Sequence, residues 1–172
     1  MDFFKVLKER HSVRLFQARP VGAEKLQAIL DAINRAPSAG NLQAYEVYLV
    51  QQADRRADLA RGAGDQEFLA QAPIVLVFCT HPMRAETRYR ERGSELYCIQ
   101  DATIACTFAM LAATALGLSS VWVGAFDEKA IREIIGAPRD QRPVAMLPVG
   151  YAAESPRIRE RRPLAQLIHQ VP

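Results

Sequence analysis

Four short segments of this sequence carry side chains that could bind a ligand, and the first lies near the N-terminus. It holds Arg10, His11, Ser12 and Arg14. Guanidinium groups and a hydroxyl suit the geometry of a phosphate, and a charge-assisted hydrogen bond is worth roughly 1.5–3 kcal/mol. The same basic residues would also suit the C-terminus of a helix, because positive charge there answers the helix dipole. Alone, the segment leaves a phosphate site and a helix end both open.

The second segment, residues 36–43, combines small residues with polar side chains. Small residues let a backbone approach a flat ligand closely, and Ser38, Asn41 and Gln43 offer both hydrogen-bond donors and acceptors. Pro37 and Gly40 interrupt regular structure there. The alternative is an ordinary loop whose residues only form turns. Two amides beside an expected apolar strand favour a binding loop.

The third segment, residues 117–126, joins the end of a long expected helix to a strand. Gly124, between Val123 and Ala125, would expose backbone N–H groups at the carboxyl end of that strand. Ligands of open α/β sheets commonly bind at such positions. A tightly packed corner with Trp122 in the core is the other interpretation, and the segment alone supports both equally.

The fourth segment is the basic C-terminal tail, which contains Arg159 and Arg161. Residues 1–20 carry five basic and two acidic side chains, and residues 157–172 carry four basic and one acidic. Since the whole chain has a net charge of +3, residues 21–156 are net negative. This distribution is typical of termini that converge on an anion, although two solvated basic tails would give the same pattern.

The elements that must position these segments alternate between helices and strands. Apolar periodicity and turn residues predict a first helix capped by Asp2, helices over 23–35, 54–60, 66–71, 94–116 (capped by Ser94) and 127–135, and strands over 45–50, 74–80, 120–123 and 144–151. Residues 81–93 are polar and rich in arginine, which predicts a surface loop. The alternation indicates an α/β or α+β sandwich with helices on both faces of a central sheet. We expect one domain over residues 1–172, of which 152–172 form a basic extension.

Composition narrows the functional classes. The chain is 49% hydrophobic and 24% charged, as in ordinary globular proteins, and its net charge is too small to indicate a nucleic-acid coat. Charged residues interrupt the N-terminus, which argues against a signal peptide, and the apolar stretch 102–118 is shorter than the roughly 20 residues of a membrane span. The three scattered cysteines favour a reducing cytoplasm and structural packing over disulfides. Cys79 and His81 lie too close together, and too far from other ligands, to predict a zinc site.

Taken together and in order, the four segments resemble one family, the nitroreductase-type FMN oxidoreductases. The resemblance runs from Phe4 to Leu167. Its motifs are Arg-x-Ser-x-Arg at 10–14, Ala-Pro-Ser-x-x-Asn-x-Gln at 36–43, Gly-Leu…Trp-Val-Gly-x-Phe at 117–126, Val-Gly-Tyr at 149–151, and the arginine-Pro-Leu tail. Each motif is weak alone, but five in order are specific.

The resemblance implies a fold, a cofactor and a binding role for each segment. The fold would be a mainly antiparallel sheet flanked by helices, in an intertwined homodimer with helix 94–116 at its centre. Arg10, Ser12 and Arg14, with His11 beside them, would hold the phosphate and ribityl chain of FMN, and Arg159 and Arg161 would complete the phosphate cage. Pro37, Ser38, Asn41 and Gln43 would come from the other subunit. Val123, Gly124 and Ala125 would lie along the isoalloxazine ring, with a backbone N–H near its N5.

The resemblance also implies the reaction. NAD(P)H would pass a hydride to the flavin and leave, and an electron-poor acceptor such as a nitroaromatic or a quinone would then take its place. The flavin would carry this ping-pong chemistry, so no catalytic side chain, metal, membrane or nucleic acid is expected. A flavin-binding carrier or sensor without turnover is the alternative, and a basic nucleic-acid-binding module is a second one.

Two departures from the family pattern carry expectations of their own. Ala44 stands where the family commonly has a proline, which predicts a looser local turn. The chain is also short for the family, so only the polar segment 81–93 could cover the flavin. Its arginines at 84, 88, 90 and 92 alternate with glutamates, which is typical of a solvated surface, although they could attract the phosphate of NADPH.

Overall fold

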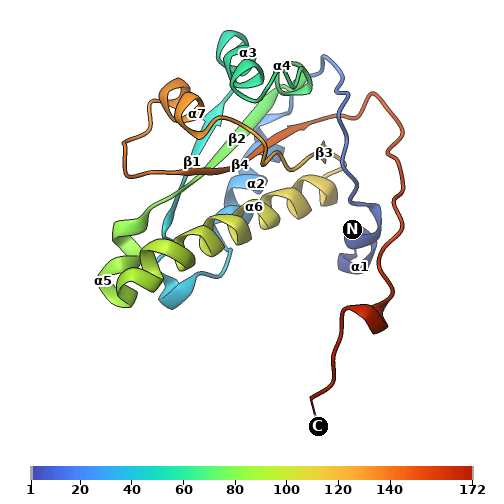
Figure 1. Ribbon diagram of the computed structural model, residues 1–172. Helices are drawn as coiled ribbons and strands as arrows, with labels where there is room; N and C mark the ends of the chain where they lie inside the picture. The colour runs from blue at the N-terminus through green and yellow to red at the C-terminus, as the bar shows by residue number, and fades with distance from the viewer. Residues whose placement is uncertain (1, 172) are drawn as a thin grey trace.

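An antiparallel sheet of four strands forms the centre of the molecule in a computed structural model, which describes residues 2–171 (Figure 1). The strands β1 (Tyr45–Val50), β2 (Ile74–Thr80), β3 (Ser119–Ser120) and β4 (Pro143–Gly150) lie in the order β1-β2-β4-β3. Every residue of β2 is buried, as its continuous apolar run predicts, because helices cover both of its faces. The predicted antiparallel sheet is therefore confirmed.

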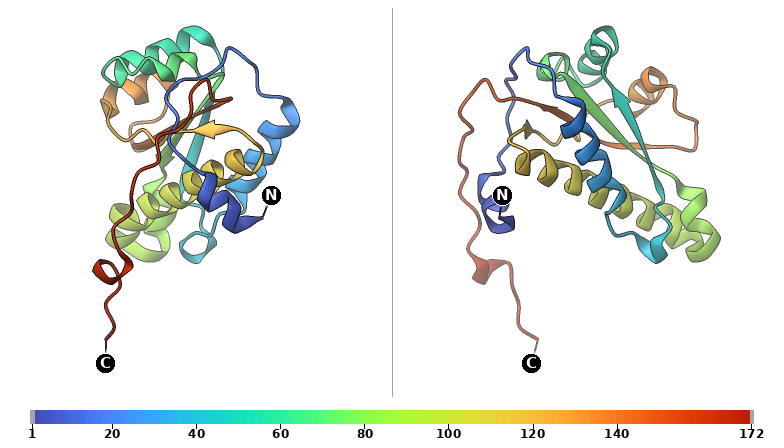
Figure 2. Two further views of the ribbon diagram at one scale, coloured as in Figure 1. Left: turned by 90° about the vertical axis from the view of Figure 1, so that its right-hand side faces the viewer. Right: turned by 180° about the vertical axis from the view of Figure 1, so that it is seen from behind.

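Helices cover the sheet in two layers (Figures 1 and 2). The helices α2 (Ala23–Asn34) and α6 (Cys98–Ala115) lie on one face, where Leu76 and Phe78 of β2 pack with Ile29 and Ala109. The helices α3 (Ala53–Gly62), α4 (Phe68–Gln71) and α7 (Glu128–Ile135) lie on the other face. There Val75 and Val77 pack with Leu59 and Ile131. Successive β2 residues thus serve opposite cores, and the predicted sandwich is confirmed.

Local signals set several helix ends where the sequence predicts them. Asp2 caps α1 (Phe3–Glu9) by accepting a hydrogen bond from the backbone N–H of Lys5 at 3.2 Å. Asp127 caps α7 in the same way through the N–H of Ala130 at 2.9 Å. Gly136 ends α7 with φ at 67°, a left-handed conformation that glycine adopts without a steric penalty.

The predicted surface loop over 81–93 is wrong, because the chain there forms α5 (Pro82–Arg92) and a π-helical turn, Gly93–Tyr97. The segment is too polar to show an apolar helical stripe, but Ala85 packs in a small buried cluster with Ala44 and Cys98. The predicted N-cap at Ser94 is also wrong. Its hydroxyl lies within the continuing helix and donates to the carbonyl of Glu91 at 3.2 Å.

The helical stretch Pro82–Ala115 is long and apolar enough to cross a membrane by length and composition, a test that the core helix of a globular protein also passes. It is not one straight rod, since Arg90 has φ 51° and ψ −141°. This kink folds α5 back, so that Gly93 packs against the backbone of Ala85. The stretch then continues as α6 along the sheet (Figure 1).

Replacing Gly93 with alanine should destabilise the protein by about 2 kcal/mol, because the added methyl group would overlap the carbonyl of Ala85, and backbone cannot move aside cheaply. Urea unfolding measures the change. Gly22→Ala is the matched control, since no atom lies within 4 Å of the added methyl group there. Equal midpoints for the two variants would mean that α5 does not pack on Gly93 in solution.

The two ends of the chain run side by side along the β3 edge of the sheet (Figures 1 and 2). The N–H of Val13 donates to the carbonyl of Ser120 at 3.2 Å, and the N–H of Gln17 donates to that of Tyr151 at 2.9 Å. The N–H of Ala153 returns a bond to Leu15 at 2.8 Å. Beyond this pairing the tail runs past α1, and up to residue 171 its one regular element is a short 3-10 turn at Leu164–Gln166 (Figure 1).

Candidate functional site

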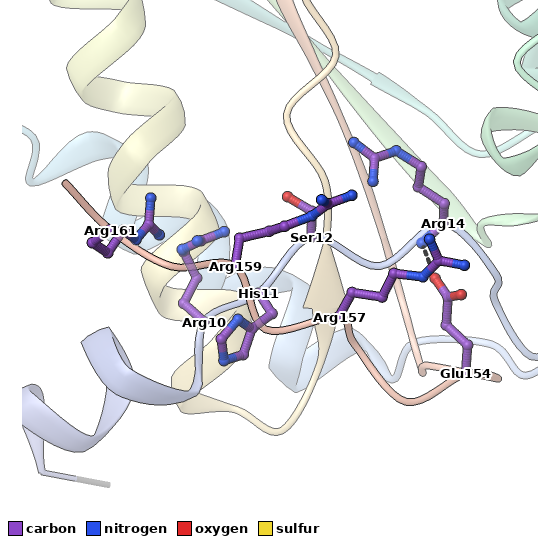
Figure 3. A pocket seen from close by; sticks show the side chains of 8 residues that line it. All are labelled: Arg10, His11, Ser12, Arg14, Glu154, Arg157, Arg159 and Arg161. Atoms are coloured by element: carbon purple, nitrogen blue, oxygen red, sulfur yellow. Dashed lines mark hydrogen bonds between the residues drawn. The ribbon is translucent and has the colours of Figure 1, made fainter.

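The paired ends of the chain enclose a cavity of about 490 Å³ (Figure 3). Its lining is basic, and all the N-terminal and C-terminal residues predicted for the site are in it. The lining residues are Arg10, His11, Ser12, Arg14, Glu154, Arg157, Arg159 and Arg161. The predicted convergence of the two basic ends on one place is therefore what the structure shows.

An extended backbone after α1 presents the N-terminal half of this lining. Arg10 ends α1, where its N–H donates to the carbonyl of Val6 at 2.9 Å. Val13 then points inward and is buried, while Ser12 and Arg14 on either side face the cavity. Phe16 is a second buried anchor. The alternation of apolar and polar residues along an extended segment thus sets which side chains face the cavity.

The cavity carries excess positive charge. Among residues 2–171, Glu154 is the one acidic residue of its lining. A carboxylate oxygen of Glu154 accepts from the backbone N–H of Arg14 at 2.6 Å (Figure 3). Within residues 2–171, none of the lining arginines forms an ion pair. Burial lowers the pKa of Arg10 below its ordinary value, and the positive charge of Arg161 lowers it further. Like charges held this close favour a bound anion, and arginine forks with a hydroxyl suit a phosphate.

The loop 36–43, the second predicted binding segment, lies away from the cavity between the chain ends, which we call the arginine cavity. Pro37 and Ser38 line a different cavity of about 560 Å³, against Tyr97 and Ile104 at the start of α6. Asn41 and Gln43 follow in the same loop, at φ values of 58° and 49°. One chain therefore does not bring this loop to the arginine cavity, and the expectation that the loop serves the site of another subunit stays a prediction.

A buried carboxylate fixes the shape of this loop. Asp101 of α6 is 2% exposed, and its two oxygens accept from the N–H of Ala39 at 2.9 Å and the N–H of Ala44 at 3.2 Å. The Ser38 hydroxyl adds a third bond by accepting from the N–H of Gln43 at 2.9 Å. The left-handed residues of the loop are thus held by hydrogen bonds from both sides.

The looser turn predicted at Ala44 is wrong. Ala44 is fully buried, and its N–H donates to Asp101 while its carbonyl accepts from the N–H of His81 at 2.9 Å. A proline at this position would lack the N–H that Asp101 binds. The alanine therefore replaces the stiffness of a proline ring with a hydrogen bond.

The third predicted segment forms an exposed corner after β3. Val123 pairs with Met146 through two backbone hydrogen bonds of 2.9 Å, an isolated bridge where the sequence predicts a longer strand. Gly124 and Ala125 are exposed, and Trp122 is partly buried, so the corner is both packed and accessible. None of these residues lines the arginine cavity.

Sequence reasoning missed three residues that shape these places. Arg157 lines the arginine cavity, and the tail's basic composition was the signal that could have included it. No sequence pattern marks Glu154 as a site residue, because its role depends on contact with a segment 140 positions away. Asp101 did have one, since it is the only charged residue in the otherwise uncharged stretch 96–126.

The cysteines are buried and free, which confirms the prediction of structural packing. Burial, and then the charge of Glu46, raise the pKa of Cys79 to about 12, and burial also raises that of Cys106. The Cys98 thiol donates to the carbonyl of Ser94 at 2.9 Å. Protonated, enclosed thiols are poor nucleophiles.

Comparison with known proteins identifies the family. Residues 7–65 and 51–151 match the sequence model of the nitroreductase family. The FMN reductase [NAD(P)H] of Bacillus subtilis is 30% identical to this chain, over 98% of this chain and 73% of its own length. The chain belongs to the nitroreductase family. Among solved structures of similar proteins, NfrA2 of B. megaterium has a TM-score of 0.90 at 27% identity, covering 99% of this chain and 74% of that one.

A further nitroreductase-like structure is the NADPH:FMN oxidoreductase of Vibrio harveyi in complex with NAD+. Its TM-score is 0.89 at 26% identity, over 98% of this chain and 76% of that one. Family membership thus agrees with the sandwich described above and extends over nearly the whole chain.

Proposed function

We propose that this protein is an FMN-dependent oxidoreductase that takes a hydride from NAD(P)H and reduces small electron-poor acceptors such as nitroaromatics or quinones. Family membership and relatives named as NAD(P)H-dependent FMN reductases support the flavin and the nicotinamide nucleotide. The reaction follows a ping-pong scheme, in which the oxidised nucleotide leaves before the acceptor binds.

The arginine cavity is the observation that carries this proposal. Arg10, Arg159 and Arg161 surround a space lined by a single carboxylate, and Ser12 adds a hydroxyl. The terminal phosphate of FMN has the charge and the acceptor oxygens that such a lining requires. Arg14 and Arg157 extend the basic surface from which the ribityl chain would leave the phosphate.

The remaining predicted residues orient the ring. When bound, FMN supplies the hydride chemistry, accepting from NAD(P)H and donating to the acceptor. Val123 is fixed by its bridge to Met146, and the exposed backbone of Gly124 and Ala125 provides N–H donors for the ring. Pro37, Ser38, Asn41 and Gln43 contribute from a second copy of the chain. No side chain of this protein needs to act as acid, base or nucleophile.

A homodimer is part of the proposal, because one chain separates the loop 37–43 from the arginine cavity. Ile104, Phe108 and Leu111 repeat at helical spacing along α6 and are only partly buried in the single chain. Phe4 of α1 is 76% exposed and Phe3 is exposed beside it. Exposed and partly exposed apolar side chains such as these on α6 and α1 favour contact with another protein chain. We further propose a cytoplasmic protein whose residues 1–172 form one domain.

Purified protein should be yellow or take up FMN, and it should bleach on anaerobic addition of NADH or NADPH. Absorbance at the flavin band measures this, and steady-state rates at several acceptor concentrations should give the parallel double-reciprocal lines of a ping-pong scheme. Protein that cannot be loaded with FMN would refute the proposal. Yellow protein that neither nucleotide reduces would indicate the carrier or sensor instead.

A further inference from the structure

The helix α5 carries an arginine surface that the FMN site leaves unused. Its members are Arg84, Arg88, Arg90 and Arg92, and all four side chains are exposed. Glutamates stand on the same stretch at 86, 91 and 95, yet within residues 2–171 none of the four arginines forms an ion pair. Four arginines against three glutamates leave this stretch with a small net positive charge.

Packing fixes this arginine surface against the loop 37–43. The Nε of Arg84 donates to the carbonyl of Leu42 at 3.1 Å. Gly40 of the loop lies so close to α5 that an added Cβ would be 2.7 Å from Nη1 of Arg88 and 2.6 Å from the hydroxyl of Tyr89. The arginines therefore hold a defined position beside the loop that we place over the flavin.

Two tyrosines orient two of the guanidinium groups. The rings of Tyr89 and Tyr97 meet edge to face, with centroids 5.0 Å apart. The Arg88 guanidinium lies 5.4 Å from the Tyr89 ring, and that of Arg92 lies 5.5 Å from the Tyr97 ring. The Nε of Arg92 also donates to the Tyr97 hydroxyl at 3.1 Å, and within residues 2–171 its two terminal nitrogens form no hydrogen bond. Side chains held in this way lose little entropy when they bind a ligand.

Arg92 is linked to the cavity beside the loop 37–43 through Tyr97, which lines that cavity together with Pro37 and Ser38. We propose that Arg88 and Arg92 bind the 2′-phosphate of NADPH and make it the preferred reductant over NADH. A phosphate monoester suits two guanidinium groups that lie against tyrosine rings and form no ion pair within residues 2–171, and NADH lacks that phosphate. The inference rests on the proposed function, since it assigns a nucleotide to the same active site.

The test compares Arg88→Ala, Arg92→Ala and the double variant with Arg55→Ala, which removes an exposed arginine from α3 on the opposite face. With FMN-loaded protein, kcat/KM should favour NADPH over NADH by at least about tenfold in the original chain and in Arg55→Ala. The double variant should lose that preference and keep its kcat/KM for NADH within about twofold. An unchanged preference in the double variant, or an original chain that favours NADH, would overturn the proposal.

Calorimetric titration provides a second readout that needs no turnover. Adenosine 2′,5′-bisphosphate should bind the original chain at least about tenfold more tightly than 5′-AMP, and the double variant should bind the two equally. Binding through the arginine cavity would not respond to Arg88 or Arg92, so an unchanged difference counts against the proposal. A chain that oxidises neither nucleotide refutes the proposed function, and this titration then still decides whether Arg88 and Arg92 form a phosphate site.

Discussion

An Asp101→Asn protein should unfold about 2 kcal/mol more easily and hold FMN at least about tenfold less tightly than the original chain. Asp101 is 2% exposed, and its two oxygens accept from two backbone N–H groups, those of Ala39 and Ala44. An amide of the same size has one acceptor oxygen. Its NH2 group would face the second N–H, so a buried donor would lose its partner.

The effect on FMN follows from the strain in the loop between those two donors. Gly40, Asn41 and Gln43 have φ values of 56°, 58° and 49°. For residues with a side chain this left-handed conformation costs on the order of 1 kcal/mol each. The bonds to Asp101 offset that cost, and without them the loop should relax and misplace Ser38, Asn41 and Gln43. Asp101 is therefore a positioning residue for the proposed flavin site.

Urea unfolding, FMN titration and hydrogen exchange check this prediction together. Exchange at the amides of Ala39 and Ala44 should accelerate in Asp101→Asn, while the amides of β2 at the centre of the sheet keep their protection. Asp31→Asn is the matched control, because it makes the same chemical change on an exposed side chain of α2. A variant with normal FMN affinity and protected loop amides would show that Asp101 does not hold the loop.

Elements whose signals are local follow the sequence closely. The bounds of β1 and β2 agree with the prediction because each is an apolar run ended by polar or turn residues. Capping by Asp127 and the glycine at 136 set α7 in the same way. In each case, the residues that decide the element lie within it or next to it.

Elements that depend on contacts between distant residues are harder to predict from local sequence signals. High polarity predicts a loop at 81–93, but Pro82 stands at the first helical position and α5 buries Ala85 against Ala44 and Cys98. The chain is already helical at Ser94, within the turn Gly93–Tyr97, so no helix begins there for Ser94 to cap. The contact of Ala85 with Ala44 joins distant positions of the chain, which no local pattern specifies.

The same distinction between local signals and distant contacts applies to the candidate site. Residue chemistry predicts that Arg10, Ser12, Arg159 and Arg161 meet, and the structure brings them to one cavity. The pairing that does so joins Gln17 to Tyr151, and no pattern in either segment specifies that register. Roles that need a second copy of the chain, such as those of the loop 37–43, lie beyond what either the sequence or one chain determines.

Replacing Arg10 with alanine should weaken FMN binding by about tenfold to a hundredfold and make the protein without FMN slightly more stable. The two effects have opposite signs for one reason. Without an anion, burial lowers the pKa of Arg10, and the like charge of Arg161 lowers it further. Removing Arg10 relieves that repulsion. With the phosphate bound, the same substitution deletes a charged hydrogen-bond donor. Arg161→Ala should have the same two effects. The double variant should lose less free energy of FMN binding than the two single variants lose in sum.

The opposite signs separate a phosphate site from a basic helix end. If Arg10 served only the dipole of α1, its loss would lower the melting temperature of the FMN-free protein and leave FMN affinity unchanged. Fluorescence titration of FMN and thermal unfolding of the FMN-free protein measure the two quantities. Arg55→Ala, which removes an exposed arginine far from the cavity, should change neither. Because α1 has only seven residues and its last turn already holds Lys8, we expect the dipole contribution of Arg10 to be the smaller one.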